Sequence, residues 1–275
     1  RSWGISTEPA TGASTVMSWT ESSTSWASGA VALIPGGTPA PVSSCVGASP
    51  TWTCGPTYSD INNLTNSNDP PGFTRNDTVN VTAGDGTEDW SATLTLTKGV
   101  RIIGPGRDSL TIRMTGGSRA VSIAPDSAAI ANDEVIQFTG LTIDLNDTLE
   151  QGVLVSGAAD TGTKPFNNLL ITDNRFKNSG QTNLVGNGVF YVTNQVRGLI
   201  ANNLIDRPRY VFRYVQGGNH CAAWQNGYFS STFGTSDSLF FENNTITWSS
   251  SVSGSFAGYT ETGQNGRAVV RYNSW

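Results

Sequence analysis

A short motif recurs five times in the second half of the chain, and it constrains the fold more than any other feature. The motif has the form apolar-x-x-Asn-x-apolar, with leucine replacing asparagine in the first copy. Successive copies are offset by 33, 29, 41 and 29 residues, which indicates a unit of about 29 residues with loops of variable length. Such a unit cannot bury its own apolar face, so the repeat predicts stacked copies around one continuous core. The copies are Phe138–Ile143, Ile171–Phe176, Ile200–Ile205, Phe241–Ile246 and Val270–Trp275.

The segments around these copies alternate between apolar and polar residues, as half-buried strands do. Clear examples are Thr93–Thr97 and Thr111–Met114. Charged residues make up only 13% of the chain, which excludes a coiled coil or long-helix protein. The chain is therefore predicted to be nearly all β. One further strand is expected between successive copies, at Gly152–Val155, Asn187–Val192, Tyr210–Tyr214 and Ser255–Tyr259.

The repeated asparagines are expected to form a buried ladder at a bend between two strands. Each amide could bond the backbone and the equivalent asparagine one repeat away. Asparagine is also common in turns, but four copies at a fixed phase between apolar positions favour the ladder. Successive repeats would stack about 4.8 Å apart through parallel hydrogen bonds. The predicted ladder residues are Asn174, Asn203, Asn244 and Asn273.

The residues before the repeats carry a resemblance to a known superfamily. They read D-T-V-N-V-T-A-G from Asp77, then W-S-A-T-L-T-L-T-K-G-V-R-I-I-G-P-G-R from Trp90 and S-L-T-I-R from Ser109. This run resembles the opening of right-handed parallel β-helix proteins of the pectin-lyase-like superfamily. With the repeats, the resemblance covers residues 57–275 and implies a right-handed parallel β-helix, or solenoid, with a short helical cap near Tyr58–Leu64. It says little about activity, because this scaffold hosts lyases, hydrolases, adhesins and viral spikes.

Residues 1–41 differ from this body and predict a short antiparallel β segment. They resemble the closing strands of surface β-sandwich modules found ahead of bacterial and phage repeat domains. Residues 42–56 are expected to be a linker that carries a Cys45/Cys54 loop. These cysteines could form a disulfide contributing about 2.7 kcal/mol through chain entropy, and the alternative is two free thiols. Because the chain ends inside a motif copy, the solenoid is expected to continue beyond it.

The net charge and the hydropathy of the chain limit which partners it can bind and where it can be located. The net charge of −5 argues against nucleic-acid binding, which needs clustered lysine and arginine. No apolar run is long enough for a membrane span. The chain shows no signal peptide, and it is interpreted as a processed or excerpted chain from an extracellular protein or from a cell or virion surface.

The densest candidate for chemistry is the segment from Asp206 to Tyr214, followed by His220. Arginines in this segment could act as a lyase base or bind a glycan, while tyrosines could stack on sugar rings. Arg209 and Arg213 would share one face of a strand, with Arg271 and Tyr272 near them. The alternative is a solvated β-face with a loop histidine. The weak catalytic candidates are Asp206, Arg209, Arg213 and His220, and the carbohydrate-binding candidates are Arg207, Tyr210, Tyr214, Trp224 and Tyr228.

Three other groups of candidate functional residues have more than one interpretation. The aromatic insertion around Trp224 and Tyr228 could be a sugar platform, a subunit interface or local loop packing. Asp144 and Asp147 could hold Ca²⁺, although turn formation is the favoured role; no other cofactor is expected. Asp173 and Glu242, placed at equivalent or nearly equivalent positions, would lie about 10 Å apart, which is wide for a hydrolase pair.

Two classes of function remain. The leading expectation is an extracellular, surface-associated β-helix that binds or processes polysaccharide or a cell-surface glycan. If it is an enzyme, it would be a polysaccharide lyase or a glycoside hydrolase. The alternative is a non-catalytic structural or adhesive protein, such as a fibre, viral spike or cell-surface assembly subunit, that forms homo-oligomers or filaments.

Overall fold

The structure is a computed structural model, and it describes most of the chain beyond residue 43. The described residues are 44–68, 71–149, 151–158, 164–179, 188–208, 210–215, 238–247, 260–263 and 268–275. The predicted N-terminal β segment and the expected strand Ser255–Tyr259 lie outside these ranges.

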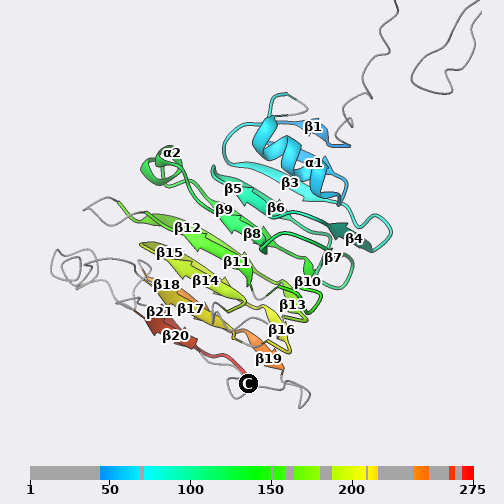
Figure 1. The fold of residues 1–275 in the computed structure, drawn as a ribbon. Coiled ribbons are helices and arrows are strands. Elements are labelled where there is room, and N and C mark those ends of the chain that lie inside the picture. Colours follow the sequence, from blue (N-terminus) through cyan, green and yellow to red (C-terminus); the bar gives the residue numbers. More distant parts are fainter. Residues whose placement is uncertain are drawn as a thin grey trace, which may run out of the picture. The chain divides into compact units, whose positions relative to one another are not determined.

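The described strands form three sheets, which we name A, B and C (Figure 1). Sheet A contains β1 (Val46–Ala48), β2 (Thr51–Cys54), β3 (Asp77–Val81), β6 (Val100–Ile103), β9 (Ile136–Thr139), β12 (Phe166–Thr172), β15 (Val196–Ala201), β18 (Leu239–Glu242) and β21 (Ala268–Arg271). Sheet B contains β4 (Thr87–Trp90), β7 (Thr111–Met114), β10 (Thr142–Asp144), β13 (Arg175–Lys177), β16 (Leu204–Asp206) and β19 (Thr245–Thr247). Sheet C contains β5 (Leu94–Leu96), β8 (Arg119–Ile123), β11 (Gln151–Ser156), β14 (Phe190–Thr193), β17 (Phe212–Val215) and β20 (Thr260–Gly263).

From β3 onward the chain visits the three sheets in rotation. Each pass, which we call a coil, adds one strand to sheet A, then one to sheet B and one to sheet C. Every strand pairs in parallel with its counterpart in the next coil. In sheet B, Ile143 pairs with Phe176 and Phe176 pairs with Ile205, so the pairing follows the spacing of the repeated motif. The prediction of a mostly β chain is confirmed, with predominantly parallel sheets.

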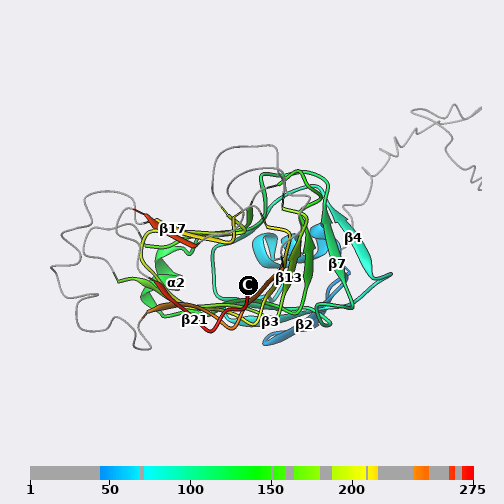
Figure 2. The same cartoon turned by 90° about the horizontal axis from the view of Figure 1, so that it is seen from below.

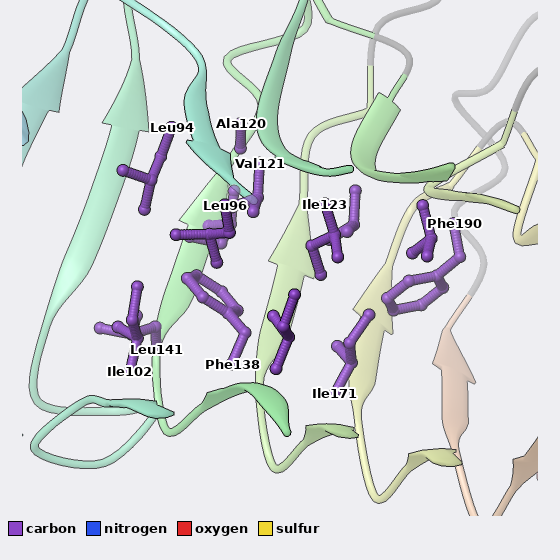
Figure 3. Packing of buried hydrophobic residues seen from close by; sticks show 14 of the residues in the cluster. Leu94, Leu96, Ile102, Ala120, Val121, Ile123, Phe138, Leu141, Ile171 and Phe190 are labelled. Atoms are coloured by element: carbon purple, nitrogen blue, oxygen red, sulfur yellow. The ribbon is translucent and has the colours of Figure 1, made fainter. Parts of the chain in front are cut away.

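The core lies between the sheets. Figure 2 shows sheets A and C on opposite sides of the interior and sheet B between them at one end. Apolar side chains alternate with polar ones along the strands, which places one apolar set inside. Figure 3 shows side chains of sheet A pointing toward those of sheet C; the labelled ones include Ile102, Phe138, Ile171, Leu96, Ile123 and Phe190.

Four asparagines form a hydrogen-bonded ladder where the chain passes from sheet A to sheet B. The Oδ1 atom of Asn203 accepts from the backbone N–H of Asn174 at 3.0 Å and from its Nδ2 at 3.2 Å. Nδ2 of Asn203 donates to the carbonyl of Ile171 and to Oδ1 of Asn244, both at 3.0 Å. Asn244 and Asn273 repeat this pattern. At the other end, the backbone N–H of Leu141 donates to Asn174. Asn174, Asn203 and Asn244 are buried, so the ladder satisfies amides that water cannot reach.

The residue before each ladder position adopts the left-handed backbone conformation. These residues are Gly140 (φ 75°), Asp173 (56°), Asn202 (57°), Asn243 (54°) and Tyr272 (56°). Glycine, asparagine and aspartate tolerate this region best, which explains the composition of the turn. Asp173 is therefore equivalent to Asn243. Glu242 aligns with Thr172 through Ala201, so Asp173 and Glu242 are offset by one residue and their positions are nearly equivalent, not equivalent.

A disulfide-linked hairpin precedes the first coil. Cys45 and Cys54 are joined by a disulfide, with an S–S distance of 2.02 Å. Strands β1 and β2 pair antiparallel, and β2 then pairs in parallel with β3. The segment expected as a linker thus adds two strands to sheet A.

Short helices lie near the first coils. They are α1 (Tyr58–Asn62), the π-helical turn η1 (Asn63–Ser67) and α2 (Ser127–Ala131). α1 occurs where the cap was expected; Thr57 caps its N-terminus, and Ile61 is fully buried. α2 was not predicted, and its N-cap Asp126 also pairs with Arg75. No helix in the described ranges is long and apolar enough to cross a membrane.

Buried Asp77 ties the hairpin to the first coil. Its carboxylate accepts hydrogen bonds from Ser49 Oγ at 2.8 Å, Trp52 Nε1 at 3.0 Å, and Thr74 N and Oγ1 at 2.9 and 2.8 Å. Burial by itself raises the pKa of this carboxyl. The hydrogen bonds outweigh burial, so the pKa lies below its ordinary value of 3.8.

This arrangement predicts acid sensitivity in the hairpin. Because the folded pKa is lowered, Asp77 stabilises the fold above pH 3.8, and this stability is lost as pH falls through the folded pKa. Urea unfolding between about pH 5 and 2 should show a steeper loss for the parent chain than for Asp77→Asn, which has no carboxyl to protonate. Equal slopes for the two proteins would contradict this role of Asp77.

Candidate functional site

The outer face of sheet C carries an aromatic and cationic pair on neighbouring strands. Tyr191 of β14 and Arg213 of β17 are register partners. The Arg213 guanidinium carbon lies 5.6 Å from the centroid of the Tyr191 ring, within the range of a cation–π contact. Both side chains are half-buried, whereas Val192 and Tyr214, which follow them, are buried. The pair therefore faces outward and remains partly accessible.

The segment between β16 and β17 carries two more of the predicted binding residues, Arg207 and Tyr210. Arg207 and Tyr210 are both half-buried. Arg207 has φ 52°, an uncommon conformation for a long side chain and the kind of strain often held at functional sites. The carbonyl of Tyr210 accepts from the backbone N–H of Val189 at 2.9 Å, which fixes the turn to β14. Tyr210 thus lies beside β14, whereas the backbone N–H of Arg207 donates to the carbonyl of Thr247 in sheet B.

Asp206 ends β16 and is held by neighbouring coils. Its Oδ2 forms a salt bridge with Arg175 at 2.5 Å, and its Oδ1 accepts from Thr247 Oγ1 at 2.6 Å. Both oxygens are therefore engaged within sheet B. This arrangement fits a structural link between coils better than a general acid or base.

The structure contradicts the sugar-stacking role predicted for Tyr214. Its side chain is 0% exposed, and its hydroxyl accepts from the backbone N–H of Val196 at 3.3 Å. The physical reason is strand alternation: Phe212 and Tyr214 point inward, so Arg213 points outward. The remaining candidates in this part of the sequence, Arg209, His220, Trp224 and Tyr228, lie outside the described residues.

Arg271 does not join this face, contrary to expectation. It belongs to β21 of sheet A, where its Nε lies 2.5 Å from a carboxylate oxygen of Glu242. Its guanidinium carbon also lies 4.8 Å from the Phe240 ring centroid and 5.2 Å from that of Tyr272. This is a second aromatic and cationic cluster, on a different sheet, with its charge paired.

The proposed calcium ligands are engaged in protein contacts. Asp144 Oδ1 accepts from the backbone N–H of Asn146 at 2.9 Å and from Asn178 Nδ2 at 2.8 Å, and its Oδ2 lies 3.3 Å from Lys177 Nζ. Asp147 is exposed, and it bonds Asn178 through its backbone N–H. The described ranges contain no group of three His, Cys, Asp or Glu side chains arranged to hold a metal ion. We therefore assign a turn role to Asp144.

Sheet B carries a row of alternating charges that the sequence reasoning missed. The strand register aligns Asp89, Arg113, Asp144, Lys177 and Asp206 in successive coils. Arg113 pairs with Asp89 at 2.7 Å, and Lys177 pairs with Asp144. A usable signal was present, because Asp144, Lys177 and Asp206 each lie three residues after a ladder position.

Comparisons with protein-family models, with curated proteins and with solved structures found no match to this chain. The side chains of the described residues therefore carry the functional inference.

Proposed function

We propose that residues 57–275 form a right-handed parallel β-helix of the pectin-lyase-like type, and that it binds polysaccharide at a cell or virion surface. The rotation of the chain through three parallel sheets supports the solenoid, as does the asparagine ladder at one bend. A rigid scaffold of this kind presents side chains of successive coils at a regular spacing, which suits an extended ligand.

The observation that carries the glycan proposal is the Tyr191–Arg213 pair. An aromatic face binds the apolar side of a sugar, and a guanidinium donates several hydrogen bonds to hydroxyl or acidic groups. Half-buried Arg207 and Tyr210 precede β17 in the coil that carries Arg213.

Binding should therefore depend on Tyr191 and not on the comparable pair on sheet A. We expect Tyr191→Ala to weaken the affinity for a bound polysaccharide about tenfold, a loss of roughly 1.4 kcal/mol, in titration calorimetry. Phe240→Ala is the matched control, since it removes an outward aromatic ring beside an arginine on another sheet. A screen of neutral and acidic polysaccharides identifies the ligand first. Equal losses for the two variants would refute the placement on sheet C, and binding of no polysaccharide would refute the function.

A structural or adhesive role is the second candidate, and the charge row of sheet B favours it. The ion pairs of this row link neighbouring coils, as expected for a stiff rod. Light scattering and electron microscopy separate the two proposals. Filaments or symmetric oligomers without glycan binding would favour the structural role, while a glycan-binding protein that forms no such assembly would favour the first.

A further inference from the structure

Arg119, the first residue of β8, is a half-buried cation that pairs with no carboxylate among the described residues. Its one side-chain hydrogen bond joins Nε to Ser118 Oγ at 3.3 Å. Burial lowers the pKa of its guanidinium, and no carboxylate in the described part of the chain offsets this effect. By contrast, Arg75, Arg113, Arg175 and Arg271 each pair with an acidic side chain. A partly buried guanidinium with free donors is a site for an anion.

Gln151, the first residue of β11, has an unpaired hydrogen-bond acceptor, whereas Arg119 has unpaired donors. Its side chain is 8% exposed, and its buried Oε1 accepts no hydrogen bond within the described part of the chain. Buried amide oxygens are nearly always paired in native proteins, so an unpaired one calls for a partner.

The two groups are neighbours. β8 and β11 pair in parallel, and Gln151 is the register partner of Arg119. Register partners project to the same side of a sheet on strands about 4.8 Å apart. Spare donors and an unpaired acceptor are thus adjacent without bonding each other.

We propose that Arg119 and Gln151 bind a hydroxy-carboxylate. The ligand's carboxylate accepts two parallel hydrogen bonds from the guanidinium, and its hydroxyl donates to Gln151 Oε1. The last torsion of glutamine is broad, so rotation of the amide on binding turns this oxygen toward the ligand. The ligand is either a free hydroxy acid or an acidic sugar within a glycan. This site is separate from Tyr191 and Arg213, and it does not rest on the proposed glycan face.

Small probes test the recognition directly. In titration calorimetry of the full chain, D-glucuronate and lactate supply both groups, D-glucose lacks the carboxylate, and acetate lacks the hydroxyl. We expect binding of glucuronate, with glucose and acetate at least tenfold weaker. If lactate and glucuronate bind with equal affinity, a free hydroxy acid suffices as the ligand. If lactate binds at least tenfold more weakly than glucuronate, the sugar ring is needed. Failure of both glucuronate and lactate to bind at millimolar concentration would overturn the proposal.

Two variants separate a binding role from a packing role. Arg119→Gln and Gln151→Met should each weaken glucuronate binding at least tenfold. Arg101→Gln, which removes a cation from sheet A, should leave it unchanged. Gln151→Met should also raise Tm by about 2–4 °C, because it removes an unpaired buried oxygen. A lower Tm for Gln151→Met would show that Oε1 is satisfied in the native protein and would overturn the inference. Unchanged glucuronate binding in both Arg119→Gln and Gln151→Met would place the ligand elsewhere and would also overturn the inference.

Discussion

Phe241→Ala should lower the free energy of unfolding by about 3–5 kcal/mol. Phe241 is fully buried in β18, between coils. Its ring stacks on Phe212 with centroids 4.8 Å apart and meets Phe190 edge-on at 6.0 Å. Alanine would leave a cavity between two aromatic neighbours and remove both ring contacts. Urea unfolding followed by circular dichroism measures the loss.

The adjacent residue supplies the control. Phe240 precedes Phe241 in the same strand but lies half-buried on the outer face, against the Arg271 guanidinium. Phe240→Ala should therefore cost about 1 kcal/mol or less. A larger loss at Phe240 than at Phe241 would mean that β18 faces the opposite way.

Asn203→Leu should lower the free energy of unfolding by about 2–4 kcal/mol, although leucine nearly preserves the volume. The substitution leaves the backbone N–H of Asn174 and the carbonyl of Ile171 without their side-chain partner in a buried place. Each buried group left unpaired costs about 1–3 kcal/mol. Thermal and urea unfolding of the variant check this loss.

Asn273→Leu is the matched control because it removes the same contacts where they are only partly buried. Asn273 accepts from the N–H of Asn244 at 2.9 Å and donates to the carbonyl of Phe241 at 3.0 Å. Water can replace these bonds, so the loss should be clearly smaller than at Asn203. If Asn203→Leu unfolds like the parent chain, the ladder does not contribute as described.

The periodic part of the fold could be predicted from the sequence because it depends on spacing alone. The offsets between motif copies match the strand register of sheet B, and the asparagines at that phase are buried. The same alternation also supplies the orientation of β17, with Arg213 outward and Tyr214 inward. The sugar-stacking role predicted for Tyr214 is wrong because side chains alternate along a strand, so a strand that points Arg213 outward points Tyr214 inward.

The site itself could be predicted only in part, because it depends on register between coils. Tyr191 lies 22 residues before Arg213, a separation that the motif offsets do not give, since the loops between sheets B and C vary in length. Arg271 was misplaced for a related reason: it belongs to the sheet A strand of the last copy, whereas Arg213 belongs to sheet C. Arg119 and Gln151 carry no local signal at all, because an unpaired donor and acceptor become visible only when their neighbours are known.

A crystal structure of the full chain is the most direct test of the stacked, in-register coils on which both proposed binding sites depend. We expect Asn203 Oδ1 within hydrogen-bond distance of the Asn174 N–H, and Ile143, Phe176 and Ile205 aligned in one parallel sheet. Tyr191 and Arg213 should lie side by side on the outer face. A solvent-exposed Asn203, or antiparallel pairing of the strands that carry these residues, would contradict the account.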